Sequence, residues 1–106
     1  MTRSAEYRAY EYAMGVLASN EQEEFEQLSS LVDTFPHGVD ELSGRPWIHN
    51  AIECGSLEAV RWIIDEKVDL GIRDEDGRTA LQAAVRRDLP HRDEILELLR
   101  RAGAPA

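Results

Sequence analysis

The sequence predicts an all-α fold in which three helix pairs, joined by polar turns, stack as a solenoid. Two observations predict this fold. Apolar residues recur at helical spacing along most of the chain, and strand-like alternation is almost absent. The stretch SGRPWIHNAI, residues 43–52, returns 33 residues later as DGRTALQAAV, residues 76–85. Self-similarity at a fixed period of about 20 to 50 residues is typical of stacked repeats, in which each unit buries its neighbour's apolar face.

Residues 1–42 predict the first helix pair. Ser4 is expected to cap a helix that begins near Ala5. The aromatic and apolar side chains of this helix are expected in the core of the pair, and a sticky surface patch is the alternative. These side chains are Tyr7, Tyr10, Tyr12, Ala13, Met14 and Leu17.

The second helix of this pair is expected to begin at a capping box formed by Asn20 and Glu23. One apolar stripe then leads to Pro36 and Gly38, which should end the helix. The stripe consists of Phe25, Leu28, Leu31, Val32 and Phe35.

The rest of the chain predicts two shorter helix pairs. One covers about residues 47–54 and 57–66, and the other covers about residues 79–87 and 92–102. Helices of this length are marginal alone in water, so packing between the pairs must hold them. The side chains expected in the core are Val60, Trp62, Ile63, Ile64, Ile95, Leu96, Leu98 and Leu99.

The doubled stretch resembles the ankyrin repeat, whose pattern is roughly D-x-x-G-x-T-P-L-H-x-A-A, followed by a glycine turn and an aliphatic helix. Residues 69–84 resemble it through Asp74, Gly77, Thr79, Leu81, Ala83 and Ala84. Residues 43–69 resemble it more loosely through Gly44, Ile48, His49, Ala51, Gly55, Ile63, Ile64 and Asp69. The resemblance implies one ankyrin-repeat domain with a degenerate capping repeat over residues 1–42, a middle repeat over 43–75 and a C-terminal repeat over 76–106.

Some residues of the repeats suit the ankyrin pattern for a physical reason, and others differ from the pattern. Gly44 and Gly77 lie where a tight turn needs positive φ, and Thr79 can cap its helix. His49 is expected to make a structural hydrogen bond. The departures from the family pattern are Pro46 for Thr, Trp47 for Pro, Lys67 for a turn glycine and Gln82 for His.

The charge balance restricts the partners that the chain can have. Its net charge of −9 comes from 21 acids and 12 bases, and residues 1–42 carry −7 of it. This balance opposes nucleic-acid binding, which needs a basic face, and it favours a basic partner. No apolar run approaches the roughly 20 residues of a membrane helix, and the first residues lack a secretory pattern. We therefore expect a cytoplasmic protein that binds neither nucleic acid nor membrane.

The sequence contains no recognisable catalytic, metal or cofactor motif. His37, His49, His91 and Cys54 lack metal-ligand spacing, and Cys54 has no second cysteine with which to form a disulfide. The segment DEDG, residues 74–77, lacks the remaining ligands of a calcium loop. We therefore expect no enzyme activity, no cofactor and no metal.

By its resemblance, the chain is expected to bind another protein with its concave face and turn tips. Small acidic chains of this kind resemble bacterial immunity proteins, some of which use ankyrin repeats to neutralise a toxin, so a basic toxin or enzyme is a candidate partner. The alternative is a structural adaptor or a scaffold subunit of a larger complex or homo-oligomer. The polar last helix favours a finished end, and hence a monomer when unbound.

The residues expected on the binding surface come from the turn tips and the first helix of each repeat. They are Leu42, Ser43, Arg45, Trp47, Glu53, Cys54, Arg73, Glu75, Asp76, Arg78, Arg86 and Arg87. Trp47 allows two interpretations, because a tryptophan beside a turn is either an exposed interface anchor or a packed side chain.

Overall fold

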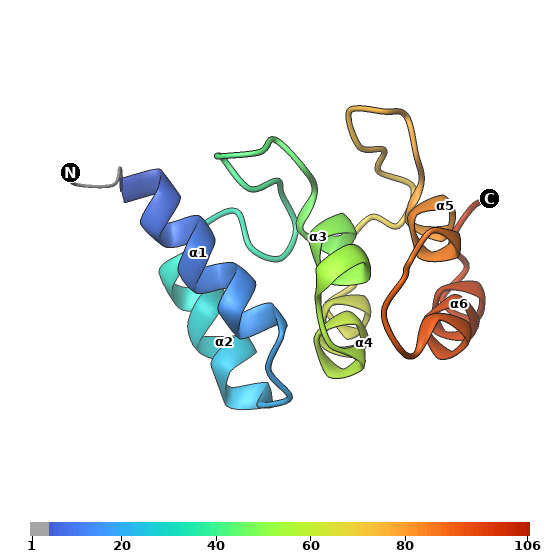
Figure 1. The fold of residues 1–106 in the computed structure, drawn as a ribbon, viewed down its shortest axis with the longest axis horizontal. Helices are drawn as coiled ribbons and strands as arrows, with labels where there is room; N and C mark the ends of the chain where they lie inside the picture. Colours follow the sequence, from blue (N-terminus) through green and yellow to red (C-terminus); the bar gives the residue numbers. More distant parts are fainter. Residues whose placement is uncertain (1–4) are drawn as a thin grey trace.

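The computed structural model describes residues 5–106, which contain six α-helices. They are α1 (Ala5–Leu17), α2 (Gln22–Leu31), α3 (Trp47–Cys54), α4 (Leu57–Asp65), α5 (Ala80–Val85) and α6 (Arg92–Arg101). Consecutive helices form pairs, and the three pairs stand side by side in chain order (Figure 1). Helices α1, α3 and α5 contact one another in turn and form one layer, and α2, α4 and α6 form the other. The predicted all-α solenoid of three helix pairs is confirmed.

The first helix begins as predicted but buries fewer side chains than predicted. The expected cap, Ser4, lies outside the described residues. Ala13 and Leu17 are fully buried, whereas Tyr7 is 37% exposed and Tyr12 is 45% exposed. The prediction that these two tyrosines belong to the core is therefore wrong. At about 100° of rotation per residue, Tyr12 falls outside the stripe that faces the neighbouring helices.

The second helix is shorter than predicted. Glu21, not Asn20, is its N-cap residue, and its side chain makes no capping hydrogen bond, so the predicted capping box is wrong. The helix ends at Leu31, which is 69% exposed, and a turn follows over residues 33–37. Phe35 is buried from this turn instead of from the helix. The proline after Phe35 explains part of the difference, because helical backbone is disfavoured at the residue before a proline.

The middle and last pairs follow their predictions more closely. Helix α3 has the predicted bounds, and Ser56 caps α4 by accepting a hydrogen bond from the Ala59 amide at 3.0 Å. Thr79 caps α5 as predicted, and the Gln82 side chain accepts from the Thr79 amide at 2.9 Å to complete a capping box. Helix α5 has only 6 residues and ends at Val85, earlier than predicted.

An aromatic cluster joins the first pair to the middle pair. The Phe35 ring stacks on the Trp62 ring with centroids 5.7 Å apart and an interplanar angle of 9°. It also meets the Trp47 ring edge-on, at 5.7 Å and 78°, and Phe25 contacts Trp62 at 6.0 Å. Such ring pairs add about 0.5–1.5 kcal/mol each beyond the area that they bury. The turn after α2 is therefore fixed against α3 and α4.

None of the helices within residues 5–106 has the length and apolar content that crossing a membrane requires.

Candidate protein-binding surface

Two loops project from the helix layers, and we call them the fingers (Figure 1). The first finger, residues 39–46, leads into α3, and the second finger, residues 73–79, leads into α5. Each turns at a glycine with positive φ, +72° at Gly44 and +79° at Gly77, as predicted. A residue with a Cβ would be strained at either position. The two glycines therefore allow the chain to reverse at the same place in both fingers.

The buried carboxylate of Asp40 holds the first finger together. Only 1% of this residue is exposed. It accepts hydrogen bonds from the Ser43 amide at 2.6 Å, from the Ser43 hydroxyl, and from the Asn50 side-chain amide at 2.6 Å. All three of these donors are uncharged. The finger is thus tied to α3 by a carboxylate whose hydrogen-bond donors do not neutralise its charge.

Asp74 holds the second finger through its backbone. Its carboxylate accepts from the amides of Asp76 at 3.0 Å and Arg78 at 2.9 Å. Burial alone would raise the pKa of Asp74. The two amide hydrogen bonds, together with the charges of His49 and Arg78, outweigh burial and hold the pKa of Asp74 below its ordinary value.

Helix α3 contacts both fingers through two consecutive side chains. Asn50 donates to Asp40 of the first finger, and His49 donates from Nε2 to the Arg78 carbonyl of the second finger at 2.9 Å. Both side chains are buried. The structural hydrogen bond predicted for His49 is confirmed, and its acceptor lies in the following repeat. One helix therefore sets the position of both fingers.

The arginines of the fingers contact the protein's own residues. Arg45 pairs with Glu53 of α3. Arg78 lies 3.3 Å from the Asp76 carboxylate, and Arg73 donates to the Gly77 carbonyl at 2.6 Å. These partners limit the conformations of the arginine side chains, so the fingers present charges in defined positions.

Two residues expected on the surface are interior residues. Trp47 is 2% exposed, and its indole N–H donates to the Thr34 hydroxyl at 2.9 Å. Arg87 is 5% exposed; its guanidinium donates to the carbonyls of Ile52 at 2.8 Å and Pro90 at 2.9 Å. Trp47 is therefore a packed side chain and not an exposed anchor, and Arg87 joins the loop after α5 to α3. Neither is available to a partner without local unfolding.

The remaining predicted residues reach the surface to different degrees. Leu42 is 45% exposed and is the more exposed of two large apolar residues of the first finger, the other being Val39. The other exposed members are Ser43, Cys54, Arg73, Glu75, Asp76 and Arg86, and the half-buried members are Arg45, Glu53 and Arg78. Val85 at the end of α5 and Leu89 in the loop after it are exposed apolar residues that were not predicted on the surface. The polar residues 86–88, which follow Val85 directly, are consistent with the early end of α5.

The described part of the chain contains no group of three or more histidine, cysteine, aspartate or glutamate side chains placed to hold a metal ion.

Comparison with protein families gives one match. The family model described as ankyrin repeats, in three copies, matches residues 15–105. Searches of curated proteins and of solved structures gave no match. The matched range includes most of the first helix pair.

Proposed function

We propose, from the premise that this chain belongs to the ankyrin-repeat family, that it binds a partner protein with its concave face and its two fingers. Ankyrin repeats are generally non-catalytic modules of protein–protein interaction. The main observation behind the proposal is that the tips of both fingers are exposed while their backbones are held in place. Leu42 and Glu75 are exposed on loops whose backbones are fixed by the buried carboxylates of Asp40 and Asp74. Loops that are already ordered lose little conformational entropy on binding.

Charge supports a basic partner. Residues 1–42 carry a net charge of −7, whereas residues 43–106 carry −2. Complementary fields accelerate encounter with a basic protein and disfavour an acidic one. We therefore propose that the chain acts as a small inhibitor, of the kind that immunity proteins are, which covers the active surface of a basic toxin or enzyme.

The alternative function is that of a structural adaptor or scaffold subunit, in a larger complex or a homo-oligomer. Tyr7 and Tyr12 on α1 favour it, because exposed aromatic side chains are enriched at interfaces. At the other end of the solenoid, α6 presents Arg92, Glu97 and Arg101 to solvent, which opposes stacking of a second copy there. Sedimentation at several concentrations separates these cases, since a stable dimer supports the homo-oligomer and a monomer opposes it.

The proposal is tested by capture of partners from the source cell and by affinity measurement with the purified candidate. The surface variant combines Leu42→Ala, Glu75→Arg and Arg86→Glu, all at exposed positions. The matched control combines Arg61→Glu and Glu66→Arg on the opposite layer. Both variants keep the net charge, and circular dichroism verifies that both fold.

We expect parent and control to bind the same protein and the surface variant to bind it at least about tenfold more weakly, which corresponds to about 1.4 kcal/mol. If the surface variant bound the partner as tightly as the parent does, the fingers would not be part of the binding site. If the partner is an enzyme or toxin, excess chain should abolish its activity; retained activity in the complex favours the adaptor function.

A further inference from the structure

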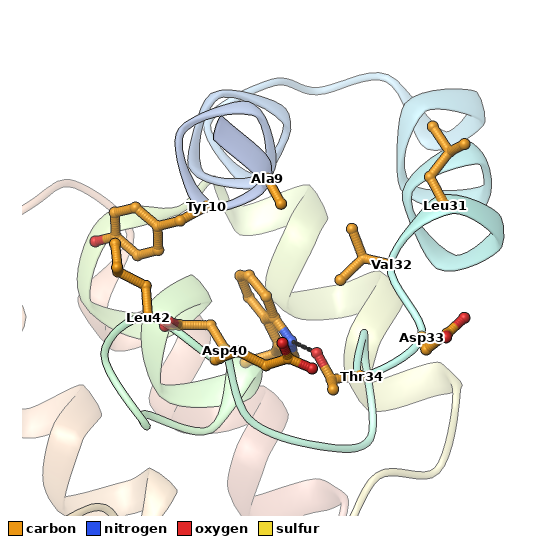
Figure 2. A pocket seen from close by; sticks show the side chains of 10 residues that line it. Ala9, Tyr10, Leu31, Val32, Asp33, Thr34, Asp40 and Leu42 are labelled. Carbon is orange, nitrogen blue, oxygen red and sulfur yellow. Dashed lines mark hydrogen bonds between the residues drawn. The ribbon is translucent and has the colours of Figure 1, made fainter. Parts of the chain in front are cut away.

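A small pocket lies beside the first finger and shares Leu42 with the surface considered above (Figure 2). Its volume is about 200 Å³, and it lies between α1, the end of α2 and the first finger. Ala9 and Tyr10 line it from α1, Val32 from the segment after α2, and Leu42 from the first finger, with Trp47 contributing from α3. Sites for small-molecule ligands usually exceed about 300 Å³. The pocket therefore matches a single side chain better than a free metabolite.

The charge around this pocket is negative. Asp33, Asp40 and Glu41 line it, and none of the described residues that line it is an arginine or a lysine. The Asp40 carboxylate is buried and has only uncharged hydrogen-bond donors, so its field acts on whatever enters. Burial, and then the charge of Asp40, raise the pKa of Tyr10 by more than the charge of Arg45 lowers it, in agreement with a net negative local field.

We propose that this pocket receives one arginine side chain of the partner protein. The inference rests on the proposed function only in that the arginine belongs to a protein partner. The apolar side chains of Val32 and Leu42 suit the aliphatic stem, and the carboxylates suit the guanidinium. Arginine is favoured over lysine because its planar, weakly hydrated head stacks on an aromatic ring such as that of Tyr10. A leucine would fill the same space but would further desolvate Asp40 without compensation.

The test is a titration of the ¹⁵N-labelled chain with N-acetyl-arginine amide, followed by NMR. The reporters are the Trp47 indole N–H, which is hydrogen-bonded to Thr34, and the Leu42 amide. Two comparison probes are N-acetyl-citrulline amide, which has nearly the same shape without the charge, and N-acetyl-leucine amide. We expect a saturable shift of both reporters with the arginine probe and at least tenfold weaker binding of the other two. Equal binding of citrulline or leucine, or no saturable shift with arginine, would overturn the proposal.

Paired variants separate the pocket from general surface charge. Ala9→Phe fills the pocket from an exposed position and leaves every acid in place, and Ala5→Phe is its control on the same helix. Glu41→Gln removes a charge at the pocket, and Glu23→Gln removes one elsewhere. We expect Ala9→Phe to abolish the arginine shift, Glu41→Gln to weaken binding severalfold, and both controls to bind as the parent does. Undiminished binding by Ala9→Phe would contradict the pocket.

The same variants distinguish failure of this inference from failure of the proposed function. If Ala9→Phe still binds the partner protein and a variant with only Glu75→Arg and Arg86→Glu, which leaves the pocket lining unchanged, does not, the proposed function holds and the arginine pocket is wrong. If the arginine probe binds the pocket and no partner protein is found, the pocket stands and the proposed function fails.

Discussion

The first and second fingers share their backbone hydrogen bonds and differ in what attaches them to the helices. In each, an aspartate amide donates to an arginine carbonyl, at 2.9 Å from Asp40 to Arg45 and at 3.0 Å from Asp74 to Arg78. The first finger is attached by its carboxylate to the helix that follows it. The second is attached by a carbonyl, which accepts from His49 on α3, the first helix of the preceding helix pair. The same loop shape is thus reached with two different sets of side chains.

The start of the following helix differs as well. Helix α5 begins at the capping box of Thr79 and Gln82, whereas α3 begins at Pro46, which has no side chain able to cap. The first finger compensates with the buried pair of Asp40 and Asn50. The two repeats therefore share their backbone geometry but stabilise it with different side chains.

The two attachments to α3 can be broken separately. We expect His49→Ala to lower the free energy of unfolding by about 3 kcal/mol, because it opens a cavity and leaves the Arg78 carbonyl without its donor. Asn50→Ala is expected to cost about 2 kcal/mol, because the Asp40 carboxylate loses a donor. Denaturant unfolding measures both values.

Hydrogen exchange shows where each variant loosens the structure. We expect His49→Ala to reduce protection in the second finger and Asn50→Ala to reduce it in the first. If either variant loosened both fingers to the same extent, the two attachments would not be independent.

Acid should weaken the second finger through Asp74. Because its pKa in the folded state lies below the unfolded value of about 3.9, its charge stabilises the fold above that pH, and the contribution is lost as pH falls through the folded pKa. Asp74→Asn keeps an oxygen acceptor for the two amides but loses the charge, so we expect a cost of about 1–2 kcal/mol at pH 7. Urea unfolding from pH 7 to pH 3 should show the parent and the variant converging in acid. A constant gap between them would contradict this role for Asp74.

The smallest expected effect concerns the helix caps. Thr79→Val keeps the side-chain volume and removes the hydroxyl, so we expect a loss of about 1 kcal/mol. The reciprocal change, Pro46→Thr, gives α3 the kind of cap that α5 has, and we expect a gain of a few tenths of a kcal/mol, because the restriction that proline places on the unfolded chain is lost. Thermal unfolding of both variants measures the two changes in stability. A loss from Pro46→Thr larger than that from Thr79→Val would show that proline rigidity outweighs capping at α3.

Much of the fold could be predicted because its signals are local. The bounds of α3, the cap of α5 and the positive φ of Gly44 follow from residues within a few positions of each other. The end of α2 could not be predicted in the same way, because the helical apolar stripe continues past Leu31 as far as Phe35.

At the candidate site, the burial of two residues could not be predicted, because it depends on contacts between distant segments. Trp47 is buried by Phe35 and Thr34 of the turn after α2, and Arg87 by the Ile52 carbonyl of α3. No local pattern reveals such contacts. The sequence contains a weak indication of the role of Asp40 in the first finger. Asp40 precedes Gly44 much as Asp74 precedes Gly77, with one residue more between them.

The hydrogen bond from His49 to the second finger has a consequence for how this chain could be rebuilt. Donor and acceptor lie in different repeats, and Arg87 likewise bonds back to Ile52. A graft that exchanged the last helix pair for that of another protein would leave His49 without its acceptor unless the new finger offered a carbonyl at the same point. The unit that can be transplanted therefore straddles the repeat boundary, from α3 to the loop after α5, and a crossover between that loop and α6 would yield a stronger chimaera than a crossover between α4 and the second finger.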